Sequence, residues 1–344
     1  MKKNLLALAA MTFAAAASAQ SSNVTLFGVA DASVAHISTS GKSVSGIANG
    51  GNSSSRLGFR GVEDLGGGLK AGFWLEGSIT VDDGTSKGFK FDRRSTVSLM
   101  GNFGEVRLGL DKTPSYQNLE DFHAFGDAGM GAINAHNLIA KAPGTVDDAN
   151  ANPKRYANSI SYLMPKLGGV YGQFTHSFGE QSGNSSLQSS TGLRLGYANG
   201  PLNVAAAYGI ARGGTAATGV DYKTMNLGAS YKFGMVTPMV LLASDRGNNQ
   251  RVDMYSVGAK IPLGAGELRA AYTWYKDKKA DNADSQRLAL GYGYKLSKRT
   301  ELYATVARMS NDDKAARKLG SSLAPTPIAG KSMTGYEIGM RHNF

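Results

Sequence analysis

Apolar and polar residues alternate with a period of two along most of this chain. Residues 104–110 alternate in this way, and so do residues 69–76, although Trp74 stands on the face that is otherwise small or polar. Successive side chains of a strand point to opposite faces, so the alternation predicts two-faced β-strands. The pattern recurs at 203–208, 225–233, 252–261, 267–275, 287–296 and 301–309.

The connections between these segments alternate between short turns and longer polar loops. Short turns fall at 65–68, 102–104, 165–169, 199–201, 262–266 and 296–299, and longer loops at 179–188, 245–250, 277–285 and 310–331. Short turns on one rim and long loops on the other are typical of outer-membrane barrels. The pattern therefore predicts an all-β fold, a 16-stranded antiparallel transmembrane β-barrel that forms one domain over residues 20–344. The barrel must close, because an open edge in lipid would leave backbone N–H and C=O groups unpaired.

The last predicted strand covers residues 332–344 and has one mostly apolar and aromatic face. That face carries Tyr336, Ile338, Met340, His342 and Phe344. We expect this strand to be part of the barrel wall, with its aromatic face toward lipid.

The first residues have the pattern of a secretory signal peptide. Lys2 and Lys3 precede an apolar run over 5–17, and Ala17-Ser18-Ala19 forms a small-residue cleavage site. This pattern predicts cleavage of residues 1–19 on export, which leaves 325 of the 344 residues. The run is shorter than the ~20 residues of a membrane-spanning helix. We therefore expect export to the outer membrane.

Composition and charge agree with an exported barrel. The chain has no cysteine, so no disulfide stabilises it, and its mean hydropathy is −0.23. Alternating lipid-facing and water-facing residues give a large barrel the same average as a soluble protein. The net charge is +11, or +9 once the signal with its two lysines is removed. We expect no nucleic-acid partner for an exported chain, and we expect Lys276, Lys278 and Lys279 to lie near anionic lipopolysaccharide.

The alternation of apolar and polar residues stops over residues 111–154. A loop of this length is uncommon in a compact fold and is usually functional. It carries the carboxylates of Glu120, Asp121 and Asp127. Two interpretations are open: the loop folds inward and narrows a channel, or it lies as an external flap over the mouth. We favour the first.

Basic residues fall on the face opposite this loop. Leu57 and Phe59 should face lipid, so Arg56 and Arg60 should face the lumen by alternation.

The next strand places a carboxylate on the same inner face. Phe73 and Leu75 should point outward, so Glu76 points inward.

The sequence shows no catalytic or metal-binding motif. The five histidines are scattered, and none lies in a G-x-S-x-G or H-E-x-x-H motif. We therefore predict no catalytic residues, no metal site and no cofactor.

Several stretches resemble a known family. They are SSNVTLFGVADASV at 21–34, SRLGFRGVEDLGGGLKAGFWLE at 55–76, FDRRSTVSLMGNFGEVRLGLDKTPSY at 91–116, RYANSISY at 155–162 and the closing HNF. Together they resemble the general porins of Neisseria, Bordetella, Comamonas and Burkholderia type. The resemblance implies a sixteen-stranded barrel that forms a homotrimer, with its third external loop in the pore and, in many members, a preference for anions. It also implies that Phe344 is a signal recognised by the barrel-insertion machinery.

The resemblance assigns four positions to the narrow part of the channel: Arg56, Glu76, Arg93 and Arg155. Arg93 conflicts with alternation, because it shares parity with outward-facing residues of its strand. Either a β-bulge re-aims Arg93, or Arg94 is the lumenal residue.

The predicted function is a water-filled channel for ions and small hydrophilic solutes, with a weak to moderate preference for anions. The alternative is a substrate-specific outer-membrane channel or a surface-binding barrel.

Overall fold

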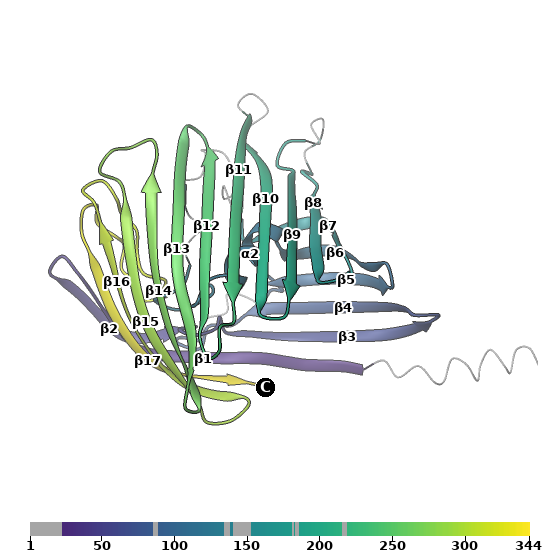
Figure 1. Cartoon of the computed structure of the whole chain (residues 1–344), viewed down its shortest axis with the longest axis horizontal. Coiled ribbons are helices and arrows are strands. Elements are labelled where there is room, and N and C mark those ends of the chain that lie inside the picture. Colours follow the sequence, from purple (N-terminus) through teal and green to yellow (C-terminus); the bar gives the residue numbers. More distant parts are fainter. Residues whose placement is uncertain are drawn as a thin grey trace, which may run out of the picture.

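The computed structural model describes residues 23–84, 89–133, 138–139, 153–180, 182, 186–214 and 219–344. The predicted signal peptide lies outside these residues, as do 134–137 and 140–152 of the predicted long loop. The described chain forms one antiparallel sheet curved into a barrel, with one short helix (Figure 1). Its strands are β1 (Asn23–Thr39), β2 (Lys42–Asn49), β3 (Arg56–Gly66), β4 (Leu69–Ser78), β5 (Arg94–Gly101), β6 (Gly104–Lys112), β7 (Arg155–Leu163), β8 (Val170–Ser177), β9 (Ser190–Asn199), β10 (Leu202–Gly214), β11 (Gly219–Tyr231), β12 (Thr237–Gly247), β13 (Gln250–Leu263), β14 (Gly266–Asp277), β15 (Ser285–Lys295), β16 (Thr300–Asn311) and β17 (Met333–Asn343).

The 17 strands occupy sixteen positions in the wall. On one side, residues 29–39 of β1 pair with β17. On the other side, residues 23–29 of β1 pair with β3 and residues 32–39 pair with β2. β2 and β3 therefore lie end to end along β1 and share one position. The predicted closed barrel of sixteen antiparallel strands is confirmed.

The seam of the barrel, where β1 pairs with β17, extends to the last residue of the chain. The backbone N–H of Gly28 donates to the carbonyl of Phe344 at 3.0 Å, and the N–H of Phe344 donates to the carbonyl of Gly28 at 3.1 Å. A Cβ added at Gly28 would lie 2.3 Å from a ring atom of Phe344, so the ring occupies the space that this glycine leaves. Tyr336 and Ile338 are exposed on the outer face, as predicted for the last strand.

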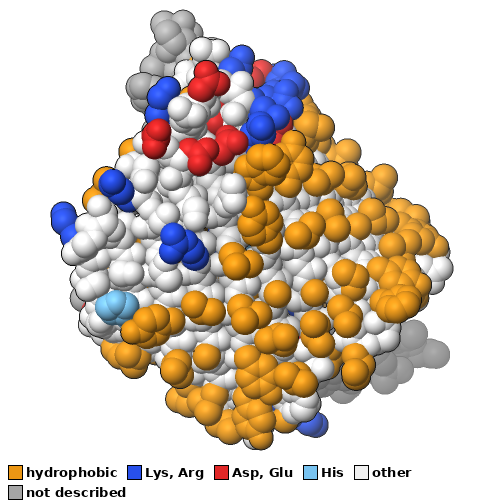
Figure 2. All heavy atoms as spheres, turned by 60° about the vertical axis from the view of Figure 1, so that its left-hand side comes forward, with side chains coloured by type: hydrophobic (Ala, Val, Ile, Leu, Met, Phe, Trp, Pro, Cys, Tyr) orange, Lys and Arg blue, Asp and Glu red, His pale blue; other side chains and the backbone are white. Residues whose placement is uncertain are grey.

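The strands have an apolar outer face and a buried inner face. In β15, Leu288 and Leu290 are 59% and 47% exposed, whereas Arg287 and Ala289, which alternate with them, are buried. Figure 2 shows apolar side chains spread over much of one outer face, with charged side chains gathered toward one end. An apolar band of this kind lets the wall contact lipid, because burying charge at that depth is costly.

The helix α2 (Pro114–Asp121) follows β6 in the predicted long loop. Thr113 caps it by accepting a hydrogen bond from the backbone N–H of Tyr116 at 3.1 Å, and Pro114 opens its first turn. The Asn118 side chain donates to Asn226 in β11 at 2.7 Å. Asn226 lies on the face of β11 opposite the exposed Leu227, so α2 packs against the inner face of the wall. No helix in the described part of the chain is long and apolar enough to cross a membrane.

One predicted connection differs from the structure. The longer loop expected at 245–250 is a two-residue turn, because β12 continues to Gly247 and β13 starts at Gln250. Asn248 and Asn249 have φ of 48° and 55°. These left-handed conformations fit a tight hairpin turn, and asparagine adopts them more readily than most residues.

Candidate functional site

A charged cavity of about 990 Å³ lies inside the barrel, between the inner faces of β1, β3–β10 and the helix α2. Nine basic and four acidic side chains line it. The basic residues are Arg56, Arg60, Arg93, Arg94, Arg107, Lys112, Arg155, Lys166 and Arg194, and the acidic residues are Glu76, Asp111, Asp121 and Asp127. The lining side chains therefore carry a formal excess of five positive charges.

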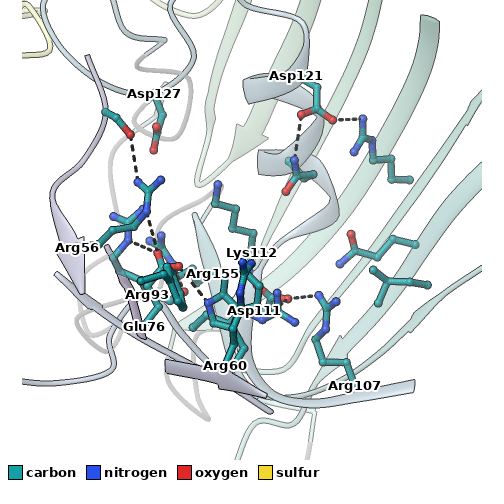
Figure 3. A pocket seen from close by; sticks show the side chains of 18 of the residues that line it. Arg56, Arg60, Glu76, Arg93, Arg107, Asp111, Lys112, Asp121, Asp127 and Arg155 are labelled. Atoms are coloured by element: carbon teal, nitrogen blue, oxygen red, sulfur yellow. Dashed lines mark hydrogen bonds and ion pairs between the residues drawn. The ribbon is translucent and has the colours of Figure 1, made fainter. Parts of the chain in front are cut away.

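Glu76 is the centre of one charged cluster (Figure 3). Its Oε1 lies 2.6 Å from Nε of Arg93 and 3.8 Å from Nε of Arg56. Its Oε2 accepts a hydrogen bond from Nε1 of Trp74 at 3.1 Å. Arg155 joins the cluster by donating from Nε to the carbonyl of Arg93 at 2.5 Å. Two guanidinium groups thus lie within 4.0 Å of one carboxylate and a third contacts the backbone of Arg93, which leaves the cluster positive.

Both Arg93 and Arg94 line the cavity. Strand β5 begins at Arg94, so the alternation that turned Arg93 outward does not extend to it. Arg93 binds Glu76, whereas Nε of Arg94 donates to the Thr96 hydroxyl at 3.0 Å and lies 3.7 Å from Asp111. Both arginines therefore line the cavity, Arg93 because it precedes the strand and not through a β-bulge.

Strand β6 supplies charged residues that the sequence analysis did not identify. Arg107 forms ion pairs with Asp111 and, at 2.8 Å, with Glu105. Arg94 reaches the same two carboxylates from β5, at 3.7 and 4.0 Å. Alternation in the sequence indicates an inward position for Arg107, because it lies between the apolar Val106 and Leu108 in the alternating stretch 104–110.

Arg194 on β9 was missed in the same way. It lies between Leu193 and Leu195, which are more than half exposed on the outer face. Its guanidinium pairs with Asp121 of α2 at 2.6 Å and donates to the Asn118 side chain at 2.9 Å. The helix is therefore held to the wall by a charged contact.

The other two predicted loop carboxylates also have lysine partners. Glu120 lies 2.6 Å from Nζ of Lys112, and it does not line the cavity. Asp127 lies 3.9 Å from Nζ of Lys154 and accepts a hydrogen bond from the hydroxyl of Tyr116 at 2.5 Å. Much of the negative charge of the loop is thus compensated locally.

Glu120 and Asp127 are close enough to shift each other's protonation. Burial raises the pKa of Glu120, and the Asp127 carboxylate raises it further, to about 7 despite the opposing effect of Lys112. Burial also raises the pKa of Asp127, but Lys154 and the hydrogen bond from Tyr116 outweigh it and lower this pKa to about 2. At neutral pH, Asp127 is ionised and Glu120 is partly protonated.

The geometry defines the class of protein. A closed barrel with an apolar outer face and a hollow, charged interior is the architecture of outer-membrane channels. Within the described residues, no group of three or more His, Cys, Asp or Glu side chains is placed to hold a metal ion.

Comparison with known proteins gives the family. Residues 6–314 match the model of the Gram-negative porin family, and the chain belongs to that family. It is 43% identical over 360 residues to outer membrane porin protein 32 of Delftia acidovorans, and the match covers 100% of both chains. An anion-selective porin from Comamonas acidovorans has a similar structure, with a TM-score of 0.88 and 39% identity over 94% of this chain and 100% of that one. OmpT of Vibrio cholerae, solved in a trimer form, shares only the fold, with a TM-score of 0.67 and 16% identity over 94% of this chain and 99% of that one.

The family confirms the main functional prediction. The chain is an outer-membrane porin, a passive general diffusion channel and not an enzyme.

Proposed function

We propose that this porin conducts small anions with a weak to moderate preference over cations. The observation that carries the proposal is the excess of nine basic over four acidic side chains around the internal cavity. Charges that line a narrow channel set which ions enter it. The anion-selective porin of Comamonas, which shares the fold at 39% identity, supports the same interpretation.

We place the narrow part of the channel between the Glu76 cluster and the loop of residues 111–154. The basic wall consists of Arg56, Arg60, Arg93, Arg94 and Arg155, with the carboxylate of Glu76 among them. The acidic side consists of the loop carboxylates Glu120, Asp121 and Asp127, of which Glu120 does not line the cavity and acts only through its field. The packing of α2 on the inner face and the ion pair between Asp121 and Arg194 support an inward position for the loop. Opposed charges across a narrow zone would orient polar solutes as they pass.

The preference should be modest, because salt screens the field of the wall. At physiological ionic strength the screening length is about 8 Å. Several of the basic residues are also paired with carboxylates, which reduces the field that a passing ion experiences. Anions should therefore be favoured without cations being excluded.

Assembly and export complete the proposal. We infer a homotrimer, cleavage of residues 1–19, recognition of Phe344 by the insertion machinery, and contact of the outer loops with lipopolysaccharide. The trimer form of OmpT supports the first point through the shared fold. The pairing of Phe344 at the barrel seam is compatible with a role in assembly.

The test is the reversal potential of the purified protein in a planar bilayer under a KCl gradient. Chloride preference over potassium is the expected result. Replacing Arg56, Arg93 or Arg155 by glutamine should lower the preference, because each change removes one positive charge from the lining. The control is Lys314→Gln, which removes an exposed loop charge that does not line the cavity.

A preference for potassium would refute the proposal, because the loop carboxylates would then dominate the narrow zone. An equal effect of Lys314→Gln and the three arginine variants would also refute it, because it would assign selectivity to total charge instead of the lining.

A further inference from the structure

Arg60 differs from the other arginines around the cavity. Arg56, Arg93, Arg94, Arg107 and Arg194 each have a carboxylate within 4.0 Å, and Arg155 donates to a backbone carbonyl. Within the described part of the chain, Arg60 has neither an ion pair nor a hydrogen bond, and its side chain is exposed in the cavity. No carboxylate of the described residues therefore lies within 4.0 Å of its guanidinium.

Two aromatic rings hold the guanidinium of Arg60 instead. Its Cζ lies 5.1 Å from the ring centroid of Phe27 and 4.9 Å from that of Trp74. The two rings contact each other edge to face, with centroids 4.9 Å apart. Such cation–π contacts attract the cation to the ring faces without using its N–H groups. The planar fork of N–H donors remains available to a ligand.

A glycine makes room for this arrangement. Phe27 pairs with Gly58 across β1 and β3, and a Cβ added at Gly58 would lie 2.5 Å from the Phe27 ring. The ring therefore lies over Gly58, on the inner face between Arg56 and Arg60. A larger residue at this position would displace the ring from Arg60.

The Arg60 guanidinium is offset from the Glu76 cluster, although Trp74 links the two by its hydrogen bond to Glu76 and also has the guanidinium of Arg94 over its ring, at 4.6 Å. Arg60 is four residues beyond Arg56 along β3, which places its Cα about 13 Å nearer the tight turn at 66–68. Apolar Leu163 and Met164 also line the cavity. The cavity therefore combines an unpaired guanidinium with aromatic and aliphatic surface.

We propose that Arg60, Phe27 and Trp74 form a docking subsite for organic monocarboxylates with an apolar body, of which benzoate is the simplest probe. A carboxylate matches the N–H fork of a guanidinium with two parallel hydrogen bonds, which chloride cannot form. The aromatic surface beside the fork contacts the apolar body. This inference rests on the proposed anion-conducting function, because the ligand must enter the channel to reach Arg60.

The experiment measures chloride current through the wild-type protein as benzoate is added. Benzoate should reduce the current in a saturable way, whereas the neutral analogue benzamide should not. Arg60→Gln should raise the half-blocking benzoate concentration about tenfold or more, the value expected for a bidentate charge-assisted pair. Arg60→Lys keeps the charge but loses the fork, so it should also weaken the block. Phe27→Leu should weaken it while leaving every charge in place.

The matched control is Lys166→Gln. Lys166 is exposed, lines the same cavity and has no ion pair among the described residues, so its loss removes the same charge from the same lumen. The subsite is refuted if Lys166→Gln and Arg60→Gln weaken the benzoate block equally, because the effect would then be general electrostatics. It is also refuted if benzoate blocks the Arg60→Lys channel as strongly as the wild type, or if benzoate and benzamide reduce the current equally.

The same recordings separate this inference from the proposed function. A wild-type channel that prefers potassium but shows an Arg60-dependent benzoate block refutes only the anion preference. A channel that prefers chloride without a benzoate block refutes only the subsite.

Discussion

Replacing Glu76 by glutamine tests the charge reasoning most directly. Glu76 is the only carboxylate within 4.0 Å of Arg56 and Arg93 among the described residues, and its side chain is 12% exposed. The substitution keeps the shape of the side chain and raises the formal charge of the lining from an excess of five to six. Both guanidinium groups then face the lumen uncompensated, so the preference for anions should increase.

The size of the effect follows from Coulomb's law. Removing the negative charge lowers the electrostatic energy of a chloride ion that passes about 8 Å away by about 0.5 kcal/mol in water. This raises the local chloride concentration roughly twofold. The energy of a potassium ion rises by the same amount. The permeability ratio of chloride to potassium should therefore rise about fivefold at low salt, and less at high salt, where screening acts over a few Å. The lost charged hydrogen bonds should also destabilise the barrel by about 2 kcal/mol.

The assay is the reversal potential in KCl gradients at low and high ionic strength, with thermal unfolding measured in parallel. Glu301→Gln is the matched control, because Glu301 is buried between Arg269, at 3.2 Å, and Arg341 but does not line the cavity. It should lose similar stability with a smaller change in selectivity. An unchanged or more cation-preferring Glu76→Gln channel would refute the reasoning, and so would an equal shift in both variants.

Three further predictions concern the loop and the seam. Ionisation of Glu120, whose pKa is raised to about 7, should lower anion preference as pH rises from 6 to 8, and Glu120→Gln should remove this dependence. Because this pKa is above its usual 4.5, the contribution of Glu120 to stability should fall as pH rises between 4.5 and 7 in thermal unfolding. Gly228→Ala should destabilise the protein by about 1–3 kcal/mol through overpacking, because the new Cβ would lie 2.2 Å from the Phe122 ring, and should alter single-channel conductance. Gly28→Val should displace the Phe344 ring and lower the yield of folded barrel in refolding assays.

Each of these predictions has a contrary outcome. A selectivity that does not change between pH 6 and 8 in the wild type would contradict the assigned pKa of Glu120. For the glycine variants the control is Gly219→Ala, since an added Cβ at Gly219 meets no atom within 4 Å. If Gly228→Ala or Gly28→Val behaves like Gly219→Ala, the proposed packing of the Phe122 or Phe344 ring is wrong.

Alternation was enough to predict the barrel and the inner-face position of many charges. Arg56, Arg60 and Glu76 line the cavity, and each lies next to an apolar residue predicted to face lipid: Leu57, Phe59 and Leu75 respectively. Arg107 and Arg194 each lie between two apolar residues and line the cavity as well, so alternation predicts their positions too. Whether these residues set selectivity remains a prediction.

The rule failed where a strand starts or is interrupted. Alternation gave the wrong face for Arg93, because a period of two has meaning only inside a strand and β5 begins one residue later. The break between β2 and β3 was not predicted, since it depends on contacts far apart in the chain. Backbone N–H groups of Gly51 and Ser53 in the break donate to the buried Asp31 carboxylate, at 3.1 and 2.6 Å. The cation–π arrangement of Arg60 also depends on distant pairing, because β1 brings Phe27 to it.

The three-way pairing of β1 has a consequence for folding kinetics. The seam joins Val29 to Asn343, positions more than 300 residues apart, whereas most other neighbouring strands are joined by local hairpins. Contacts between distant residues form slowly, because the chain must lose the entropy of a long loop before they form. The hairpins should therefore form first, and the pairing of β1 with β17 should form last. Until the seam closes, β1 and β17 are open sheet edges that can pair with other chains, so the rate of seam closure sets how long the folding barrel is exposed to aggregation.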